Sequence, residues 1–238
     1  MITKNKKLNV KSSDSDNDIG NELMQAFKSL ESDGDNRKLG LYGELDVEKG
    51  EMCVYTLLHL HDTRMKKVPR PLTTAQKKKI KKATQENDNS AQIELKFDDV
   101  SQPIEFIIST PGGRACDMFS IYDTMRMIRK DCDIHTFGLG QVMSAGTLLL
   151  ASGTKGKRKI GRHCRVMLHQ VSAGTSGPHH EMMNEIAEIE YTQQQYIKCL
   201  AAETKMSETY IRKLFERKVN IYMSAEEAVK HGLADIIV

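Results

Sequence analysis

The apolar positions of this chain fall into short runs whose spacing alternates between that of a strand and that of a helix. Strand-like runs predict buried strands at 39–43, 104–108, 134–139, 164–168 and 236–238. Helical spacing predicts helices at 48–62, 117–129, 144–153, 180–203 and 207–217, and a capping-box pattern at 224–227 begins a last helix that ends at Gly232. Because strands and helices alternate, we predict an α/β fold with largely parallel strands.

Two stretches interrupt this pattern. Residues 1–18 are rich in Ser, Asp and Asn and are expected to be disordered, whereas the apolar spacing of 19–31 predicts a helix. Residues 64–102 contain the basic run 77–82 and an alternating piece at 93–97, which predicts an edge strand. We therefore expect an N-terminal polar and acidic segment at 1–37 and a main domain at 38–238 that carries a basic surface insertion at 64–102.

The net charge of +3 conceals an uneven distribution. Residues 64–90 hold nine Lys/Arg and two acids, a local charge of +7, so the rest of the chain carries −4. The overall charge therefore gives no argument for nucleic-acid binding. The apolar runs are too short to span a bilayer, and no secretory signal is recognised. Five widely spaced cysteines without a Cys-x-x-Cys pair indicate reduced thiols, so we expect a cytoplasmic protein. We also expect no cofactor and no metal.

Ser144 stands where an apolar strand turns into an apolar helix, and His169 ends another strand 25 residues later. Each alone has an ordinary interpretation, Ser144 as a helix N-cap and His169 as a hydrogen-bonded core histidine. Together they favour an activated nucleophile, because a serine hydroxyl reacts only when a base takes its proton. The first N–H group of the helix, that of Ala145, then becomes a natural oxyanion donor.

The pair Gly112-Gly113 ends another predicted strand. It is either a turn that needs positive φ angles or a second oxyanion donor through the N–H of Gly113. The turn alone does not choose between these interpretations.

Several motifs, in order, closely resemble Clp peptidase proteolytic subunits over about residues 38–62 and 104–238. They are the segments 109–113, 121–125, 155–158, 165–170 and 223–228, and Gly140 followed by Ser144. The resemblance implies a crotonase-like fold of stacked ββα units and a serine endopeptidase that itself needs no ATP. It also implies unfolded polypeptide substrates, self-association into heptameric rings stacked as a tetradecamer, and an ATP-driven AAA+ unfoldase as partner. By the same resemblance, Ser144 is the nucleophile, His169 the base, Gly113 and Ala145 the oxyanion donors, and 171–203 the ring-to-ring handle.

Three features depart from the family pattern. The position of the triad aspartate is Asn220, which can orient an imidazole but cannot stabilise an imidazolium by charge. Glu216 and Asp235 are alternative acids with no geometric preference between them. The insertion 64–102 has no counterpart in the usual family member; it is a solvated excursion or a docking element for an acidic partner. The positions of the unfoldase pocket, usually aromatic, are Glu105, Ile107 and Met127.

The leading hypothesis is a cytosolic, ring-forming serine endopeptidase. The alternatives are a catalytically silent subunit of a mixed ring, a crotonase-type acyl-CoA enzyme, and a specialised processing protease. The loss of a carboxylate at 220 favours the silent subunit, whereas the retained Ser144 and His169 disfavour it.

Overall fold

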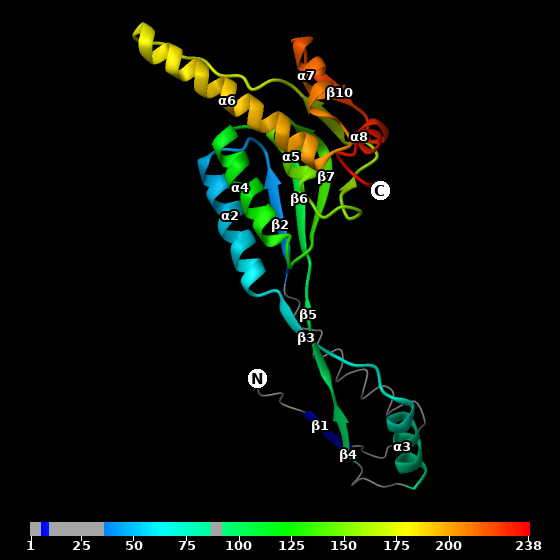
Figure 1. The fold of residues 1–238 in the computed structure, drawn as a ribbon. Helices are drawn as coiled ribbons and strands as arrows, with labels where there is room; N and C mark the ends of the chain where they lie inside the picture. The colour runs from blue at the N-terminus through cyan, green and yellow to red at the C-terminus, as the bar shows by residue number, and fades with distance from the viewer. Residues whose placement is uncertain (1–5, 10–35, 87–91) are drawn as a thin grey trace. The chain divides into compact units, whose positions relative to one another are not determined.

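The computed structural model describes residues 6–9, 36–86 and 92–238 (Figure 1). The described residues fall into two compact units, one made of 37–64 and 102–238 and the other of 6–9, 36, 65–86 and 92–101. The predicted helix at 19–31, and the predicted disorder of 1–18 apart from residues 6–9, lie outside the described residues. Residues 6–9 form a strand, so the prediction of disorder is wrong for these four residues.

The larger unit is built on a seven-stranded sheet. Its main path runs in the order β10 (Ile221–Met223), β9 (Arg165–Leu168), β7 (Ile134–Met143), β6 (Ile104–Thr110) and β2 (Lys38–Tyr42). The strand β8 (Lys159–Ile160) pairs with β7 and with β11 (Ile236–Ile237). All these pairings are parallel except that of β10 with β9, which confirms the predicted α/β fold.

Helices complete this unit. The helices α2 (Val47–Asp62) and α4 (Ala115–Ile128) lie side by side in Figure 1. The helix α5 (Ala145–Ala151) is buried over all seven residues, as expected of a helix that is apolar apart from Thr147. The long helix α6 (His179–Glu203) packs its C-terminal part on α5 and on α7 (Glu208–Glu216). The helix α8 (Ala225–His231) begins at the predicted capping box of Ser224 and Glu227, and Gly232 ends it in the left-handed region.

The core follows from the alternation of side chains along the strands. In β6, every second residue is buried, so one face of the strand packs against the core. The buried residues of β6 are Ile104, Phe106, Ile108 and Thr110. Because the carboxyl ends of parallel strands meet at one edge, the segments after β6, β7 and β9 come together there. This edge holds the candidate site.

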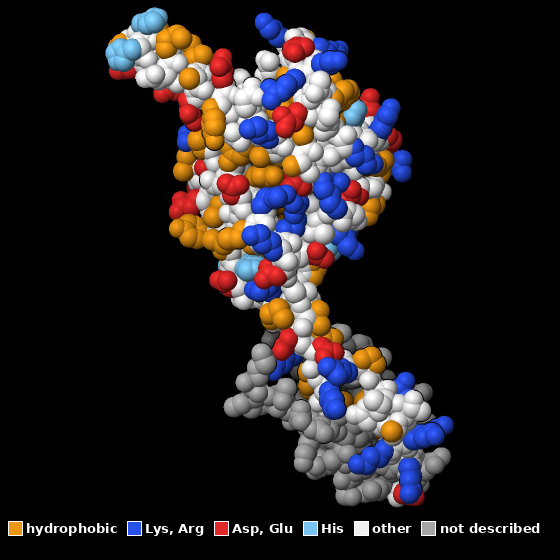
Figure 2. Space-filling model, viewed as in Figure 1, with side chains coloured by type: hydrophobic (Ala, Val, Ile, Leu, Met, Phe, Trp, Pro, Cys, Tyr) orange, Lys and Arg blue, Asp and Glu red, His pale blue; other side chains and the backbone are white. Residues whose placement is uncertain are grey.

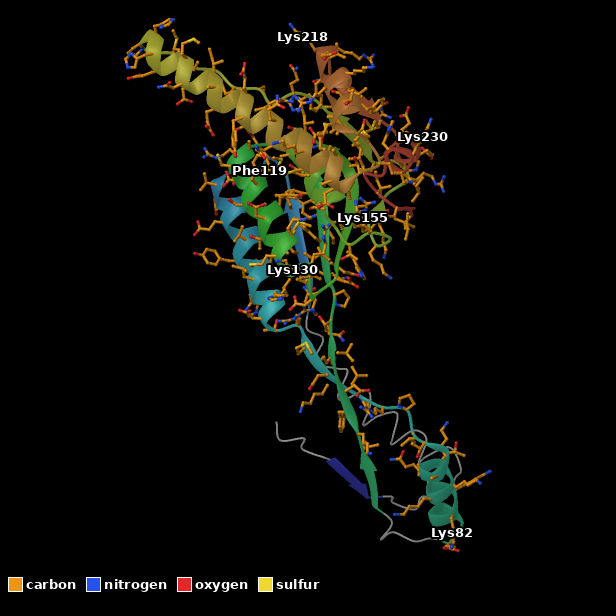
Figure 3. The ribbon with its side chains drawn as sticks, in the orientation of Figure 1. Lys82, Phe119, Lys130, Lys155, Lys218 and Lys230 are labelled. Atoms are coloured by element: carbon orange, nitrogen blue, oxygen red, sulfur yellow. The ribbon has the colours of Figure 1, made fainter. Side chains whose placement is uncertain are left out.

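The smaller unit contains two antiparallel ribbons and one helix. The strand β3 (Met65–Pro69) pairs with β5 (Phe97–Ser101), and β1 (Lys6–Asn9) pairs with β4 (Gln92–Leu95). The helix α3 (Thr74–Gln85) carries the basic run, with Lys82 near its end, and Lys and Arg side chains gather over this part of the unit (Figures 2 and 3). A strand was expected at 93–97, but the structure has a break in it, because Lys96 separates β4 from β5.

In the larger unit, two short strands have no counterpart in the predictions. β8 contributes two residues and β10 three, and runs this short carry no recognisable alternation. Among the described residues, no helix is long and apolar enough to cross a bilayer.

Candidate active site

Ser144 occupies a strained turn between β7 and α5. Its φ of 53° and ψ of −120° lie in a region that residues with a side chain rarely adopt. The backbone N–H of Ser144 donates to the carbonyl oxygen of Met167 at 2.8 Å, which ties the turn to β9. The turn thus presents the hydroxyl at the carboxyl edge of the sheet.

Gly112 is needed beside this turn. It has a φ of 109°, and a Cβ atom built on it would lie 2.5 Å from the Cβ of Ser144. Any other residue would therefore both strain the backbone and displace the serine. This close approach explains the first glycine of the pair that the sequence left open.

The pairing of β7 with β9 brings His169 to Ser144. Met143 lies opposite Met167 in this parallel pair, so the residues that follow the two strands emerge together. The ring Nε2 of His169 lies 2.7 Å from the Oγ of Ser144, within hydrogen-bond distance. The two candidate residues that the sequence singled out therefore meet in the fold.

Burial of the ring lowers the pKa of His169 below its ordinary value of 6.5. A neutral imidazole can accept the serine proton, so this shift favours the base form. A nearby carboxylate would raise the pKa instead. Within the described part of the chain, the other ring nitrogen of His169, Nδ1, has no hydrogen-bond partner.

Asn220 lies where its predicted role would place it along the chain, but among the described residues it makes no hydrogen bond to the histidine. The β9–β10 register pairs Leu168 with Ile221, and one step further sets Asn220 opposite His169. Asn220 is exposed, and no hydrogen bond to His169 is recorded among the described residues. The role of Asn220 stays a prediction.

Neither of the two alternative acids, Asp235 and Glu216, makes a hydrogen bond to His169 among the described residues. Asp235 accepts from the Nε of Arg158 at 2.8 Å and from the backbone N–H of Gly156 at 2.7 Å, so its carboxylate is engaged elsewhere. Glu216 is exposed at the end of α7.

A cavity of about 140 Å³ opens beside the Ser144–His169 pair. Gly113 and Ala145, the two candidate oxyanion donors, both line it. Gly113 has a φ of 151°, and a Cβ atom there would lie 2.0 Å from the carbonyl oxygen of Leu45. The loop is held by two backbone hydrogen bonds, from Leu45 N–H to Gly112 and from Arg114 N–H to Leu45. The other lining residues are Arg114, Ala115, Met118, Ser144, His169, Gln170, Val171, Ser172 and Tyr196.

Two residues near the site escaped the sequence analysis. Thr147 and Tyr196 both hydrogen-bond to the carbonyl oxygen of Ser144. Each occurs in an apolar helical pattern, where a core position is the ordinary interpretation, and nothing in their spacing signals the contact. Among the described residues, no group of three or more metal-ligating side chains comes together.

A parallel α/β sheet that holds a serine and a histidine at its carboxyl edge is typical of serine hydrolases. The chain matches the family model described as Clp protease over residues 74–238. It is similar to the ATP-dependent Clp protease proteolytic subunit 2 of Chlamydia trachomatis serovar D, with 38% identity over 144 residues, 60% of this chain and 69% of the relative. It is also similar to the proteolytic subunits 1 of Prochlorococcus marinus subsp. pastoris and Corynebacterium jeikeium. The identities are 36% over 143 residues (60% of this chain, 71% of the relative) and 34% over 153 residues (64% and 79%).

The chain belongs to the Clp protease family. The resemblance noted from its motifs is thereby confirmed, and so is the fold class that the resemblance implied.

Proposed function

We propose that this chain is a serine-type endopeptidase subunit that hydrolyses unfolded polypeptides. The single observation that carries the proposal is the 2.7 Å distance between the Nε2 of His169 and the Oγ of Ser144. Neutral His169 takes the hydroxyl proton as Oγ attacks the peptide carbonyl carbon, and the N–H groups of Gly113 and Ala145 receive the oxyanion. The protonated imidazole then gives its proton to the leaving amine, and water repeats the sequence on the acyl-enzyme.

The experiment is labelling of the assembled protein with a fluorophosphonate probe, followed by mass spectrometry of the adduct. Labelling is expected at Ser144 and should be lost in Ser144→Ala and fall by at least about 10³ in His169→Ala. Ser120→Ala is the matched control, because the Ser120 hydroxyl is exposed and donates to the Cys116 carbonyl within α4. An assembled protein that takes up no probe would contradict the proposal.

One observation favours a second candidate, a catalytically silent subunit of a mixed ring. Among the described residues, no carboxylate contributes to the pKa of His169, so none of them compensates the charge of the imidazolium formed in the reaction. Failure to label alone, with labelling restored at the serine of a partner subunit in a mixed ring, would support this candidate.

Self-association into heptameric rings, stacked as a tetradecamer, belongs to the same proposal. The first half of α6 is exposed on most of its surface and carries the exposed apolar side chains of Met183, Ile186 and Tyr191 (Figure 2). An apolar helix face of this kind supports burial against a second copy. Native mass spectrometry measures the copy number.

An ATP-driven unfoldase is the proposed partner, because the relatives are named as subunits of ATP-dependent proteases. The candidate docking positions are mixed in character. Met127 is half-exposed, whereas Glu105 makes an ion pair with Lys38 at 3.5 Å. A complementary partner surface would therefore combine apolar and basic groups.

A further inference from the structure

The carbonyl oxygen of Ser144 is surrounded by hydrogen-bond donors. It receives the backbone N–H of Thr147 at 3.0 Å, the Oγ1 of Thr147 at 2.6 Å and the hydroxyl of Tyr196 at 3.0 Å. The two hydroxyl oxygens lie 2.8 Å from each other. This cluster stands directly behind the candidate nucleophile.

Counting protons shows how the two hydroxyls work together. They have one proton each and share three contacts, so only two of the contacts are hydrogen bonds at one time. Either both hydroxyls donate to the carbonyl, or one donates to the other and that second one donates to the carbonyl. Removing either hydroxyl leaves the other free to bond the carbonyl directly. The pair therefore acts as one unit, and loss of both hydroxyls leaves only the Thr147 N–H on this oxygen.

Tyr196 brings this hydroxyl from a distant part of the chain. It lies on the docked part of α6, is only 4% exposed, and stacks on Phe215 of α7 with ring centroids 6.2 Å apart. Burial raises the pKa of Tyr196, so its hydroxyl keeps its proton through any assay range. Thr147, fully buried on α5, is equally fixed.

The carbonyl of Ser144 and the N–H of Ala145 belong to the same peptide unit. A trans peptide is planar, so these two groups point in opposite directions. Holding the carbonyl toward Tyr196 and Thr147 therefore aims the Ala145 N–H the other way. Ser144 and Ala145 line the cavity, and the φ of 53° and ψ of −120° at Ser144 form a strained combination that the surrounding structure has to hold in place.

We propose that Tyr196 and Thr147 are positioning residues that fix the Ser144–Ala145 peptide and so aim the oxyanion donor of Ala145. The inference rests on the proposed function for its kinetic consequence, but the peptide orientation itself does not depend on activity. The pair acts through the peptide, and neither hydroxyl touches the reacting atoms.

The kinetic experiment measures how fast the fluorophosphonate probe acylates Ser144 in wild type, Tyr196→Phe, Thr147→Val and the double variant. Each single change should slow the bond-forming step by up to about tenfold and leave the affinity for the probe unchanged. The double variant should lose more than the product of the two single losses, because each remaining hydroxyl compensates for the other. Thr147→Ser, which keeps a hydroxyl, should restore most of the rate.

Tyr210→Phe is the matched control. Tyr210 is partly exposed and stacks on His231 with ring centroids 5.7 Å apart, away from this cluster. Its acylation rate should equal that of wild type. The pH dependence of acylation in Tyr196→Phe should keep its midpoint and lose only its height. A shifted midpoint would mean that Tyr196 acts on His169 instead, which would overturn the proposal.

A crystal structure of the double variant decides the inference independently of activity. We expect the Ser144–Ala145 peptide to rotate, which would move the ψ of Ser144 away from its present −120°. An unchanged peptide in the double variant would overturn the inference, whatever the wild type does. A wild type that does not label, with a rotated peptide in the variant, would remove the proposed function and leave the positioning role of the pair intact.

Discussion

His169 at the candidate site and Glu203 at the end of α6 are both ionisable groups removed from water, but their surroundings favour opposite charge states. His169 is partly buried, and no acid of the described part of the chain shifts its pKa. Glu203, at the C-terminal end of α6, is fully buried and contacts three cations. The surroundings of His169 favour the neutral imidazole, whereas those of Glu203 favour the ionised carboxylate and hold it in place.

The contacts of Glu203 join separate elements of the fold. Arg126 of α4 and Arg129, the C-cap residue of this helix, reach its carboxylate at 2.9 and 3.0 Å, and Lys155 lies 3.6 Å away. Lys155 also bonds the main-chain carbonyl of Glu203. Tyr122 adds its hydroxyl at 3.3 Å. The cluster thus binds α4 and the loop after α5 to the end of α6.

A buried group stays ionised only where hydrogen bonds and opposite charges offset the cost of removing it from water. Burial alone would raise the pKa of Glu203, but the bonds from Arg129 and Arg126 and the charge of Lys155 outweigh it, so the pKa lies below the usual 4.5. At His169, burial acts without such opposition, and the pKa falls. Burial therefore accompanies an ionised anchor at Glu203, where cations offset it, and a neutral proton acceptor at His169, where it acts unopposed.

The largest effect is expected from breaking the anchor. Glu203→Gln should lower the free energy of unfolding by about 3 kcal/mol, because it leaves clustered cations without their anion. Glu208→Gln is the control; it breaks only a surface pair with Arg212 and should cost less than about 0.5 kcal/mol. Urea denaturation of both variants measures the difference, and equal midpoints would contradict the anchoring role.

The pH dependence of this variant sharpens the same point. The folded pKa of Glu203 is lowered, so ionised Glu203 contributes stability above the unfolded value of 4.5. That contribution is lost as the pH falls through the folded pKa. The stability gap between wild type and Glu203→Gln should therefore narrow in acid, as urea midpoints measured from pH 7 downward would show. A gap that stays constant would mean that the Glu203→Gln variant is destabilised by altered packing and not by the lost charge.

The next effect comes from giving His169 an acid. Asn220→Asp should raise kcat/KM for a fluorogenic peptide by about tenfold or more, because a carboxylate stabilises the imidazolium that forms during attack. Asn220→Ala is the matched control and should not gain. An Asn220→Asp variant that is no faster than wild type would show that position 220 is too far from the ring.

A smaller effect concerns the acid limb of the pH–rate profile. The base is neutral His169, whose pKa is lowered by burial, so kcat/KM should rise with pH through a midpoint below 6.5. In Asn220→Asp the midpoint should move upward, because the new charge favours the protonated ring. A wild-type midpoint above 6.5 would imply an acid near His169 after all.

The smallest effect should come from Arg126. Its side chain is half-exposed, and Arg129 still holds Glu203 when it is removed. Arg126→Gln should therefore cost no more than about 1 kcal/mol in the free energy of unfolding. A loss as large as that of Glu203→Gln would mean that the three cations act as one unit.

The fold followed from the sequence where apolar runs were long. The predicted strands at 104–108 and 134–139 and the helix at 180–203 are present with shifted or extended ends. The meeting of Ser144 and His169 was predictable because both follow strands whose carboxyl ends share one edge. The pairing of β10 with β9 was not, because three residues carry no periodic signal, and the exposed position of Asn220 depends on that pairing.

The supports of the site were beyond the sequence for a different reason. Tyr196 and Glu203 lie 52 and 59 residues after Ser144, and their contacts depend on how α6 docks. A tyrosine in an apolar pattern and a glutamate at a helix end have common interpretations that need no partner. Only the tertiary packing distinguishes these positions from ordinary ones.

The complete burial of α5 has a consequence for measurement. The seven residues that follow the candidate nucleophile expose almost nothing to solvent, so their amides should exchange with deuterium only when the whole domain opens. Chemical labelling at Ser144 would then count intact molecules, and its loss in urea should trace the same curve as circular dichroism. The hydroxyl at the head of α5 would thus serve as a built-in gauge of the folded fraction.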